Sequence, residues 1–123
     1  MKPLRVVICQ GDNAGAHVLA SSFAPHAHSV HVASSPENLR ETILKARADV
    51  LVLDMEIVPL EEMNRIHREF SDLCIIGIHR LADEEIWAAA LNSGASDVCD
   101  SSDTASILRS VLNATALTRG TAA

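Results

Sequence analysis

The feature that most limits how this chain can fold is a regular alternation of short apolar runs with amphipathic stretches. The apolar runs are rich in Val and Ile, and most are too short for helices, which favours strands. They cover residues 4–9, 29–33, 49–54, 73–78 and 96–100. The segments between and after them have the apolar spacing of helices, at 13–24, 59–70, 83–93, 103–115 and after Ser35. Strict alternation of strand and helix predicts a parallel sheet with helices on both faces.

Local signals indicate where several of these helices begin and end. Asp12 is a candidate N-cap of the first helix, and Ser35 followed directly by Pro36 predicts the start of the second. Gly94 predicts a stop after the 83–93 segment. The inner face of the first helix is predicted to consist of Val18, Leu19, Ser22 and Phe23. These signals support the same order of elements as the apolar spacing.

Length and composition favour one folded domain. The chain has 123 residues, of which 48% are hydrophobic, so it can bury a core without disulfides or a structural metal. We expect the domain to cover residues 1–116, and residues 117–123 to form a flexible tail or the start of a linker. No apolar run approaches the roughly 18 residues of a membrane span, and the N-terminus has no signal-cleavage pattern. We therefore expect a cytoplasmic protein without a membrane partner.

The cysteines predict reduced thiols. Cys9, Cys74 and Cys99 form no C-x-x-C pair, and each lies in or beside an apolar segment. An odd number of such cysteines in a chain of this kind favours buried free thiols over disulfides or a zinc site.

The charge balance argues against direct nucleic-acid binding by this domain. The net charge is −6 with His neutral, and the 10 Lys and Arg residues are scattered along the chain. Contacts to phosphate dominate nucleic-acid affinity, and an acidic domain lacks them. Aromatic residues make up only 2% of the chain, with no Tyr, so there is little to stack on bases.

Polar residues follow the predicted strands at their carboxyl ends, which is where ligands bind in an open doubly wound sheet. The stretch ADVLVLDME is a nearly continuous apolar run that ends in a carboxylate, Asp54. The other strand ends carry Gln10, Gly11 and Asp12, then His79 and Arg80, then Ser101 and Ser102. We expect these residues to gather in one shallow pocket.

Taken together, these segments resemble a response-regulator receiver domain, the phosphoacceptor module of two-component signalling. ADVLVLDMEIVP resembles the third strand that ends in the phosphorylated aspartate, which implies that Asp54 is the phosphoacceptor position. IIGIHRLADEEIWAAALNSGASDV resembles the fourth strand, the fourth helix and the turn into the fifth strand. SDTASILRSVLNATA is similar to the last helix of receivers that precede a LuxR/NarL-type DNA-binding domain. The resemblance implies a CheY-like, flavodoxin-like (βα)5 three-layer sandwich with sheet order 2-1-3-4-5.

The chain departs from the receiver pattern where receivers hold magnesium. They carry an acidic pair just after the first strand, and Gln10 and Gly11 fall at that place, leaving Asp12 next in line. Magnesium prefers oxygen ligands, above all carboxylates. We therefore expect Asp12 and Asp54 to bind magnesium weakly or not at all, and no other cofactor.

The chain also departs at the positions that act on the phosphoryl group and in switching. His79 replaces the hydroxyl residue at the end of the fourth strand, Ser101 replaces the lysine after the fifth, and Val98 replaces the aromatic switch residue. Transfer of a phosphoryl group to a carboxylate needs its charge neutralised, and a neutral hydroxyl does not do this. We expect inefficient phosphorylation of Asp54. Our hypothesis is that a protonated His79 interacts directly with Asp54 in place of metal or lysine.

We interpret the chain as an atypical receiver, or pseudo-receiver, that is not an enzyme and regulates transcription through an output domain outside this sequence. Two alternatives stay open: a working phosphoacceptor with a degenerate pocket, phosphorylated on Asp54, and a small ligand-binding domain of the same fold. The expected partners are a sensor histidine kinase or another regulatory protein. A second copy of the chain, bound through the last two helices and the fifth strand, is a further expected partner.

Overall fold

One five-stranded parallel sheet forms the centre of the protein. In the computed structural model, residues 4–33 and 35–122 are described, with side chains as far as residue 114. The strands are β1 (Arg5–Cys9), β2 (Ser29–Val32), β3 (Val50–Asp54), β4 (Cys74–His79) and β5 (Asp97–Asp100). Their order is β2-β1-β3-β4-β5, and every neighbouring pair is parallel. The predicted doubly wound α/β fold with sheet order 2-1-3-4-5 is confirmed.

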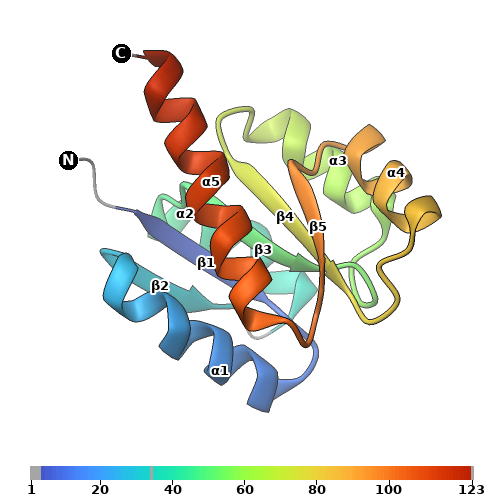
Figure 1. Ribbon diagram of the computed structural model, residues 1–123, viewed down its shortest axis with the longest axis horizontal. Helices are drawn as coiled ribbons and strands as arrows, with labels where there is room; N and C mark the ends of the chain where they lie inside the picture. Colours follow the sequence, from blue (N-terminus) through green and yellow to red (C-terminus); the bar gives the residue numbers. More distant parts are fainter. Residues whose placement is uncertain (1–3, 34, 123) are drawn as a thin grey trace.

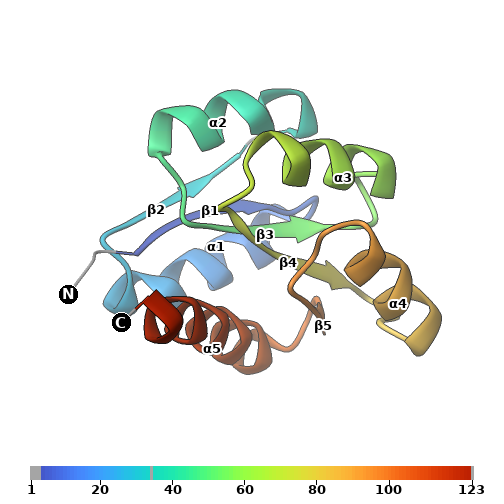
Figure 2. The ribbon, with the colours of Figure 1, turned by 90° about the horizontal axis from the view of Figure 1, so that it is seen from above.

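Helices cover both faces of this sheet, which gives three layers (Figures 1 and 2). The α-helices are α1 (Asn13–Phe23), α2 (Leu39–Ala46), α3 (Leu60–Glu69), α4 (Glu84–Asn92) and α5 (Thr104–Ala122), and short 3-10 helices cover Ala24–His26 and Pro36–Asn38. Figure 2 shows α2 and α3 on one face and α1 and α5 on the opposite face. None of the helices in the described part of the chain is long and apolar enough to cross a membrane.

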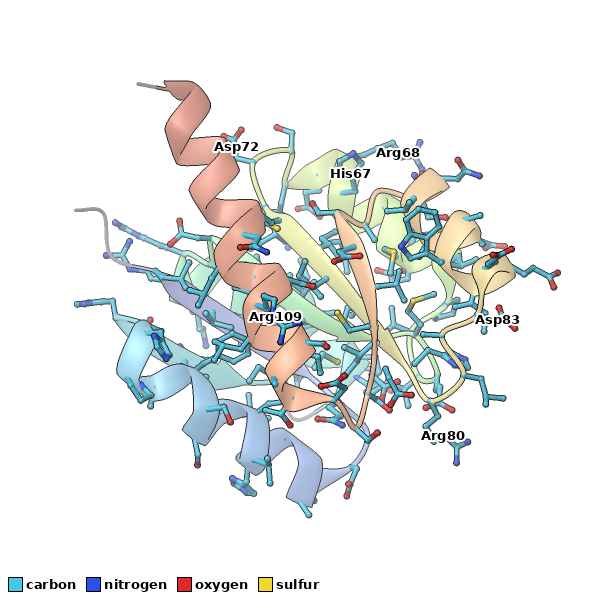
Figure 3. The ribbon with its side chains drawn as sticks, in the orientation of Figure 1. His67, Arg68, Asp72, Arg80, Asp83 and Arg109 are labelled. Atoms are coloured by element: carbon cyan, nitrogen blue, oxygen red, sulfur yellow. The ribbon has the colours of Figure 1, made fainter. Side chains whose placement is uncertain are left out.

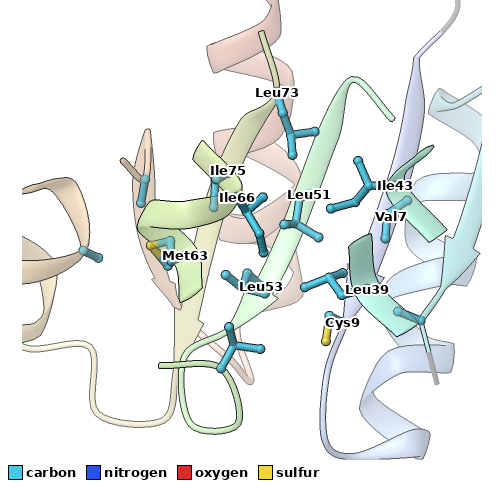
Figure 4. Close-up of a cluster of buried hydrophobic side chains, with 14 of the residues drawn as sticks. Val7, Cys9, Leu39, Ile43, Leu51, Leu53, Met63, Ile66, Leu73 and Ile75 are labelled. Carbon is cyan, nitrogen blue, oxygen red and sulfur yellow. The ribbon is translucent and has the colours of Figure 1, made fainter. Parts of the chain in front are cut away.

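Two apolar clusters, one on each face, hold the layers together. Successive strand residues point to opposite faces, so Leu51 and Leu53 pack towards α2 and α3 while Val50 and Val52 pack towards α1 and α5. Figure 4 shows the first cluster around Leu51 and Leu53. Every residue of β3 is buried, which explains why its sequence is apolar without a break up to Asp54.

The first helix begins as predicted, and its inner face agrees with the prediction in part. The Asp12 side chain accepts a hydrogen bond from the Gly15 N–H at 3.2 Å, which caps α1. The predicted burial of Val18 is wrong, because its side chain is 55% exposed. Leu19 and Phe23 are buried as predicted, Ser22 is half-buried, and Ala16 completes the buried face. Ala16, Leu19 and Phe23 follow the spacing of one helix face, and Val18 lies outside that face.

The second and last helices also differ from the prediction. Ser35 makes no capping hydrogen bond with its side chain, and Pro36 opens a 3-10 turn before α2 begins at Leu39. The last helix runs on to Ala122, past its predicted end at residue 115; residues 115–119 contain no glycine or proline, and the helix continues through Gly120. Whether residues 117–123 lead into a linker stays a prediction.

The thiols lie in or near the core, as predicted. Cys9 and Cys99 are buried and Cys74 is half-buried, and all three are free. In this they behave as small apolar residues.

Gly94 ends α4 in a conformation that favours glycine, and this gives a first test of the packing. Its φ is +114°, and a Cβ at this position would lie 2.4 Å from Cγ of His67 on α3. We expect Gly94→Ala to lower the free energy of unfolding by about 2 kcal/mol or more, measured by urea denaturation. In a His67→Ala background the loss should shrink but remain, since the backbone strain persists. An unchanged stability in Gly94→Ala would contradict the described turn.

Candidate functional site

A pocket lies at the carboxyl ends of the strands, where the strand order reverses. Its volume is about 650 Å³. It is lined by Gln10, Gly11, Asp12, Gly15, Val18, Asp54, Glu56, Ile57, Arg80, Ser101, Ser102 and Thr104. The sequence analysis predicted that the strand-end residues gather here, and the structure brings together all of them except His79. In Figure 1 the start of α1 and the turn between β5 and α5 lie at this same edge of the sheet.

Asp54 is the buried acid at the base of the pocket. It is 6% exposed, and among the described residues it is the one charged side chain that is buried. Its Oδ2 accepts a hydrogen bond from the Gly11 N–H at 3.0 Å, and its Oδ1 accepts one from the Glu56 N–H at 2.9 Å. The carboxylate therefore joins the loop after β1 to the turn after β3, and it lines the pocket as well.

The side chains of Gln10 and Asp12, which follow β1, contact the first turn of α1. Asp12 is exposed and its Oδ2 caps the helix through Gly15. The Gln10 side chain lies against the same helix, since a Cβ on Gly15 would come within 2.7 Å of Gln10 Nε2. Gln10 Oε1 is buried and, among the described residues, has no hydrogen-bond partner. Gln10 and Gly11 thus stand where the resemblance implies an acidic pair, and the carboxylate next in line, Asp12, serves as a helix cap.

These donors fit a magnesium ion poorly. Both oxygens of Asp54 already accept backbone hydrogen bonds, and Asp12 serves as a helix cap. Within residues 4–33 and 35–122, no group of three or more His, Cys, Asp and Glu side chains is arranged to hold a metal ion. Magnesium prefers near-octahedral oxygen coordination, and among the described side chains that follow β1, Asp54 has beside it only Asp12, which is engaged as a helix cap, and the amide of Gln10.

The hypothesis that His79 pairs with Asp54 is wrong. His79 Nδ1 accepts a hydrogen bond from the Leu81 N–H at 2.9 Å, and no bond or ion pair joins it to Asp54 in the described residues. The reason is the sheet register: Asp54 is opposite Ile78, so His79 lies one residue further and points to the other face. His79 is half-buried and does not line the pocket.

Of the other two predicted switch positions, Ser101 lines the pocket and Val98 does not. Ser101 lines the pocket and contributes a neutral hydroxyl. Val98 is buried in β5 beside Gly77, where a Cβ would lie 3.6 Å from Val98 Cγ2, and it faces away from the pocket. The structure does not test whether either residue has a switching role, and that part stays a prediction.

An ion pair at the mouth of the pocket was missed from the sequence. Arg80 Nε donates to Glu56 Oε1 at 2.7 Å, and Figure 3 shows Arg80 projecting from the end of β4. This hydrogen bond lowers the pKa of Glu56 and raises that of Arg80, and the charge of Asp54 raises the Arg80 pKa a little further. The sequence signal that could have predicted this pair is that Glu56 and Arg80, with opposite charges, follow the ends of neighbouring strands β3 and β4.

The pocket carries more negative than positive charge. Its described lining residues include three carboxylates, Asp12, Asp54 and Glu56, and one cation, Arg80. That cation is already bonded to one of the carboxylates. An approaching anion therefore meets repulsion with little compensating positive charge.

The fold is shared with solved receiver domains. A receiver domain of a two-component response regulator from Bacteroides fragilis has a TM-score of 0.82 and 23% identity, covering 92% of this chain and 97% of that one. RcsB from Salmonella typhimurium has a TM-score of 0.82 and 20% identity, covering 98% of this chain and 62% of that one. NtrX from Brucella abortus, solved in complex with ADP, has a TM-score of 0.80 and 14% identity, covering 98% of this chain.

These likenesses establish the fold, which is that of response-regulator receiver domains. The chain spans only 29% of the NtrX chain, so the activities of longer proteins do not carry over to it directly. No protein-family model and no curated protein matches the sequence.

The hydrogen bonds to Asp54 predict that this acid stabilises the protein. Asp54→Ala leaves the Gly11 and Glu56 N–H groups without their acceptors, so we expect the free energy of unfolding to fall by about 1 to 3 kcal/mol. Asp54→Asn keeps one acceptor oxygen and should lose less. Asp72→Ala, at an exposed loop position seen in Figure 3, serves as the control and should change little. A stability gain in Asp54→Ala would contradict the described bonds.

Cys9 should be unreactive in the folded protein. Burial, and to a smaller extent the charge of Asp54, raises its pKa to about 11. Because the thiolate is the reactive species, we expect maleimide or iodoacetamide at pH 8 to label Cys9 only as the protein unfolds. Peptide mapping by mass spectrometry with and without urea measures this. Immediate labelling without urea would show that the site is more open than described.

Proposed function

We propose that this chain is the signal-receiver domain of a response regulator and acts in signal transduction, not as a catalyst. Two observations support this. The fold matches receiver domains over most of the chain, and Asp54 lies at the end of β3 in a pocket at the carboxyl edge of the sheet. That is the position at which the sequence resemblance puts the phosphoacceptor. The cytoplasmic location expected from the sequence stays a prediction.

Within this class, we propose an atypical receiver that is not phosphorylated efficiently on Asp54. The charge balance of the pocket carries this proposal. Phosphoryl transfer relies on positioning and on neutralising negative charge, and the pocket offers three carboxylates against one engaged guanidinium. The poor fit to magnesium points the same way, since the ion would otherwise supply the missing positive charge.

A working phosphoacceptor with a degenerate pocket is the second candidate. Asp54 lines the pocket although it is only 6% exposed, so one carboxylate remains within reach of a phosphodonor. In that case the Gly11 and Glu56 N–H groups would have to share their acceptor oxygens with the incoming group.

The proposed partners are proteins. A sensor kinase or another regulator would contact the edge of the sheet around the pocket, and a second copy would bind through α4, β5 and α5. Trp87 on α4 is 46% exposed, which gives that face an aromatic contact residue. An output domain of the LuxR/NarL type beyond α5 would connect the signal to transcription.

Intact-mass measurement after incubation with acetyl phosphate and magnesium tests the proposed function. We expect no lasting phosphoryl adduct on the wild-type chain, and no difference from Asp54→Ala. Rapid, near-complete addition of one phosphoryl group that is absent in Asp54→Ala would establish the second candidate and overturn the first.

A further inference from the structure

The ion pair between Glu56 and Arg80 engages the one cation among the described residues that line the pocket. Arg80 Nε is 2.7 Å from Glu56 Oε1, and both residues line the pocket. Arg80 is also close enough to Asp54 for that charge to raise its pKa. The one cation among the described lining residues thus lies beside the buried acid but is neutralised by a different carboxylate.

The backbone fixes the position of Glu56. Its N–H donates to Asp54 Oδ1 at 2.9 Å, so the turn that carries Glu56 is tied to the buried acid itself. Its side chain is 24% exposed, against 80% for Arg80. The carboxylate is therefore the better-held partner, and the longer arginine side chain reaches over to it.

An arginine in this place is suited to bind phosphate. Its planar guanidinium presents paired donors that match phosphate oxygens, and it stays charged at any physiological pH. Glu56 holds the Nε–H of Arg80, so an incoming phosphate competes with this carboxylate for the guanidinium and remains near the same negative charge. Glu56 therefore opposes anion binding twice, by occupying Arg80 and by adding its own charge.

We propose that Glu56 is the residue that makes this pocket reject phosphate and phosphoryl groups, and that Arg80 is a latent anion-binding group released when Glu56 is neutralised. The inference builds on the proposed function, because it names the side chain responsible for much of the poor phosphorylation. On this proposal, the single substitution Glu56→Gln lets the pocket bind phosphate.

The pair is well suited to mutation because it contributes little to folding. Exposed ion pairs contribute little to stability, and the substitution Glu56→Gln keeps the backbone N–H that bonds to Asp54. Glu62→Gln is a matched control. It breaks a similar exposed pair, in which Arg65 Nη1 lies 2.9 Å from Glu62 Oε2, on α3 outside the pocket.

The test compares wild type, Glu56→Gln, Arg80→Gln, the double variant and Glu62→Gln. Inorganic phosphate is titrated at constant ionic strength while the Gly11 and Ser102 amides are followed by NMR. We expect Glu56→Gln to bind phosphate about tenfold more tightly than wild type or better. The double variant should return to near the wild-type affinity, and Glu62→Gln should not differ from wild type.

The same variants are then incubated with acetyl phosphate and magnesium, and the rate of adduct formation on Asp54 is measured. Glu56→Gln should form the adduct at least about tenfold faster than the wild-type rate or its detection limit, and the gain should vanish in the double variant. Equal phosphate affinity in wild type and Glu56→Gln overturns the inference, and so does a gain that survives removal of Arg80. Rapid reaction of the wild type overturns the proposed function instead, so the two failures are distinguishable.

Discussion

Two backbone hydrogen bonds to the Asp54 carboxylate are the interaction on which the pocket depends. They fix the loop after β1 and the turn after β3 to the same side chain, through Gly11 and Glu56. The position of the turn then decides where the Glu56 side chain lies, and with it the guanidinium of Arg80. An acid left buried without such bonds would be costly, so these contacts explain how Asp54 can be 6% exposed and still part of an open pocket.

The same bonds set the electrostatics of the site. Two N–H groups already stabilise the Asp54 carboxylate without a metal ion or a lysine, and the nearby Arg80 is held by Glu56. The described charged groups of the pocket are thus largely held by partners within the protein, and their net charge is negative.

Much of the fold could be predicted from the sequence, because its signals are local. The unbroken apolar run of β3, the cap at Asp12 and the stop at Gly94 each follow from short-range chemistry, and the structure confirms them. The place of the pocket also followed, since parallel strands deliver their ends to one edge of the sheet. The exposure of Val18 could not be predicted. Whether Ala16 or Val18 is buried depends on how α1 packs against the sheet, which is not a local property of the sequence.

The parts of the site that could not be predicted depend on register and on loop geometry. The direction of His79 is decided by which residue of β4 lies opposite Asp54, and a shift of one residue reverses it. The Glu56–Arg80 pair joins two loops from different strands, so no spacing within either segment reveals it.

The most direct test of whether the pocket's negative charge excludes phosphoryl groups is an NMR titration of the wild-type chain with beryllium fluoride and magnesium. Together these mimic the phosphoryl group with its metal. If the pocket rejects such groups, the Gly11, Glu56 and Ser102 amides should show no saturable shift at millimolar concentrations. Saturable shifts of these three amides that disappear in Asp54→Ala would contradict the central claim.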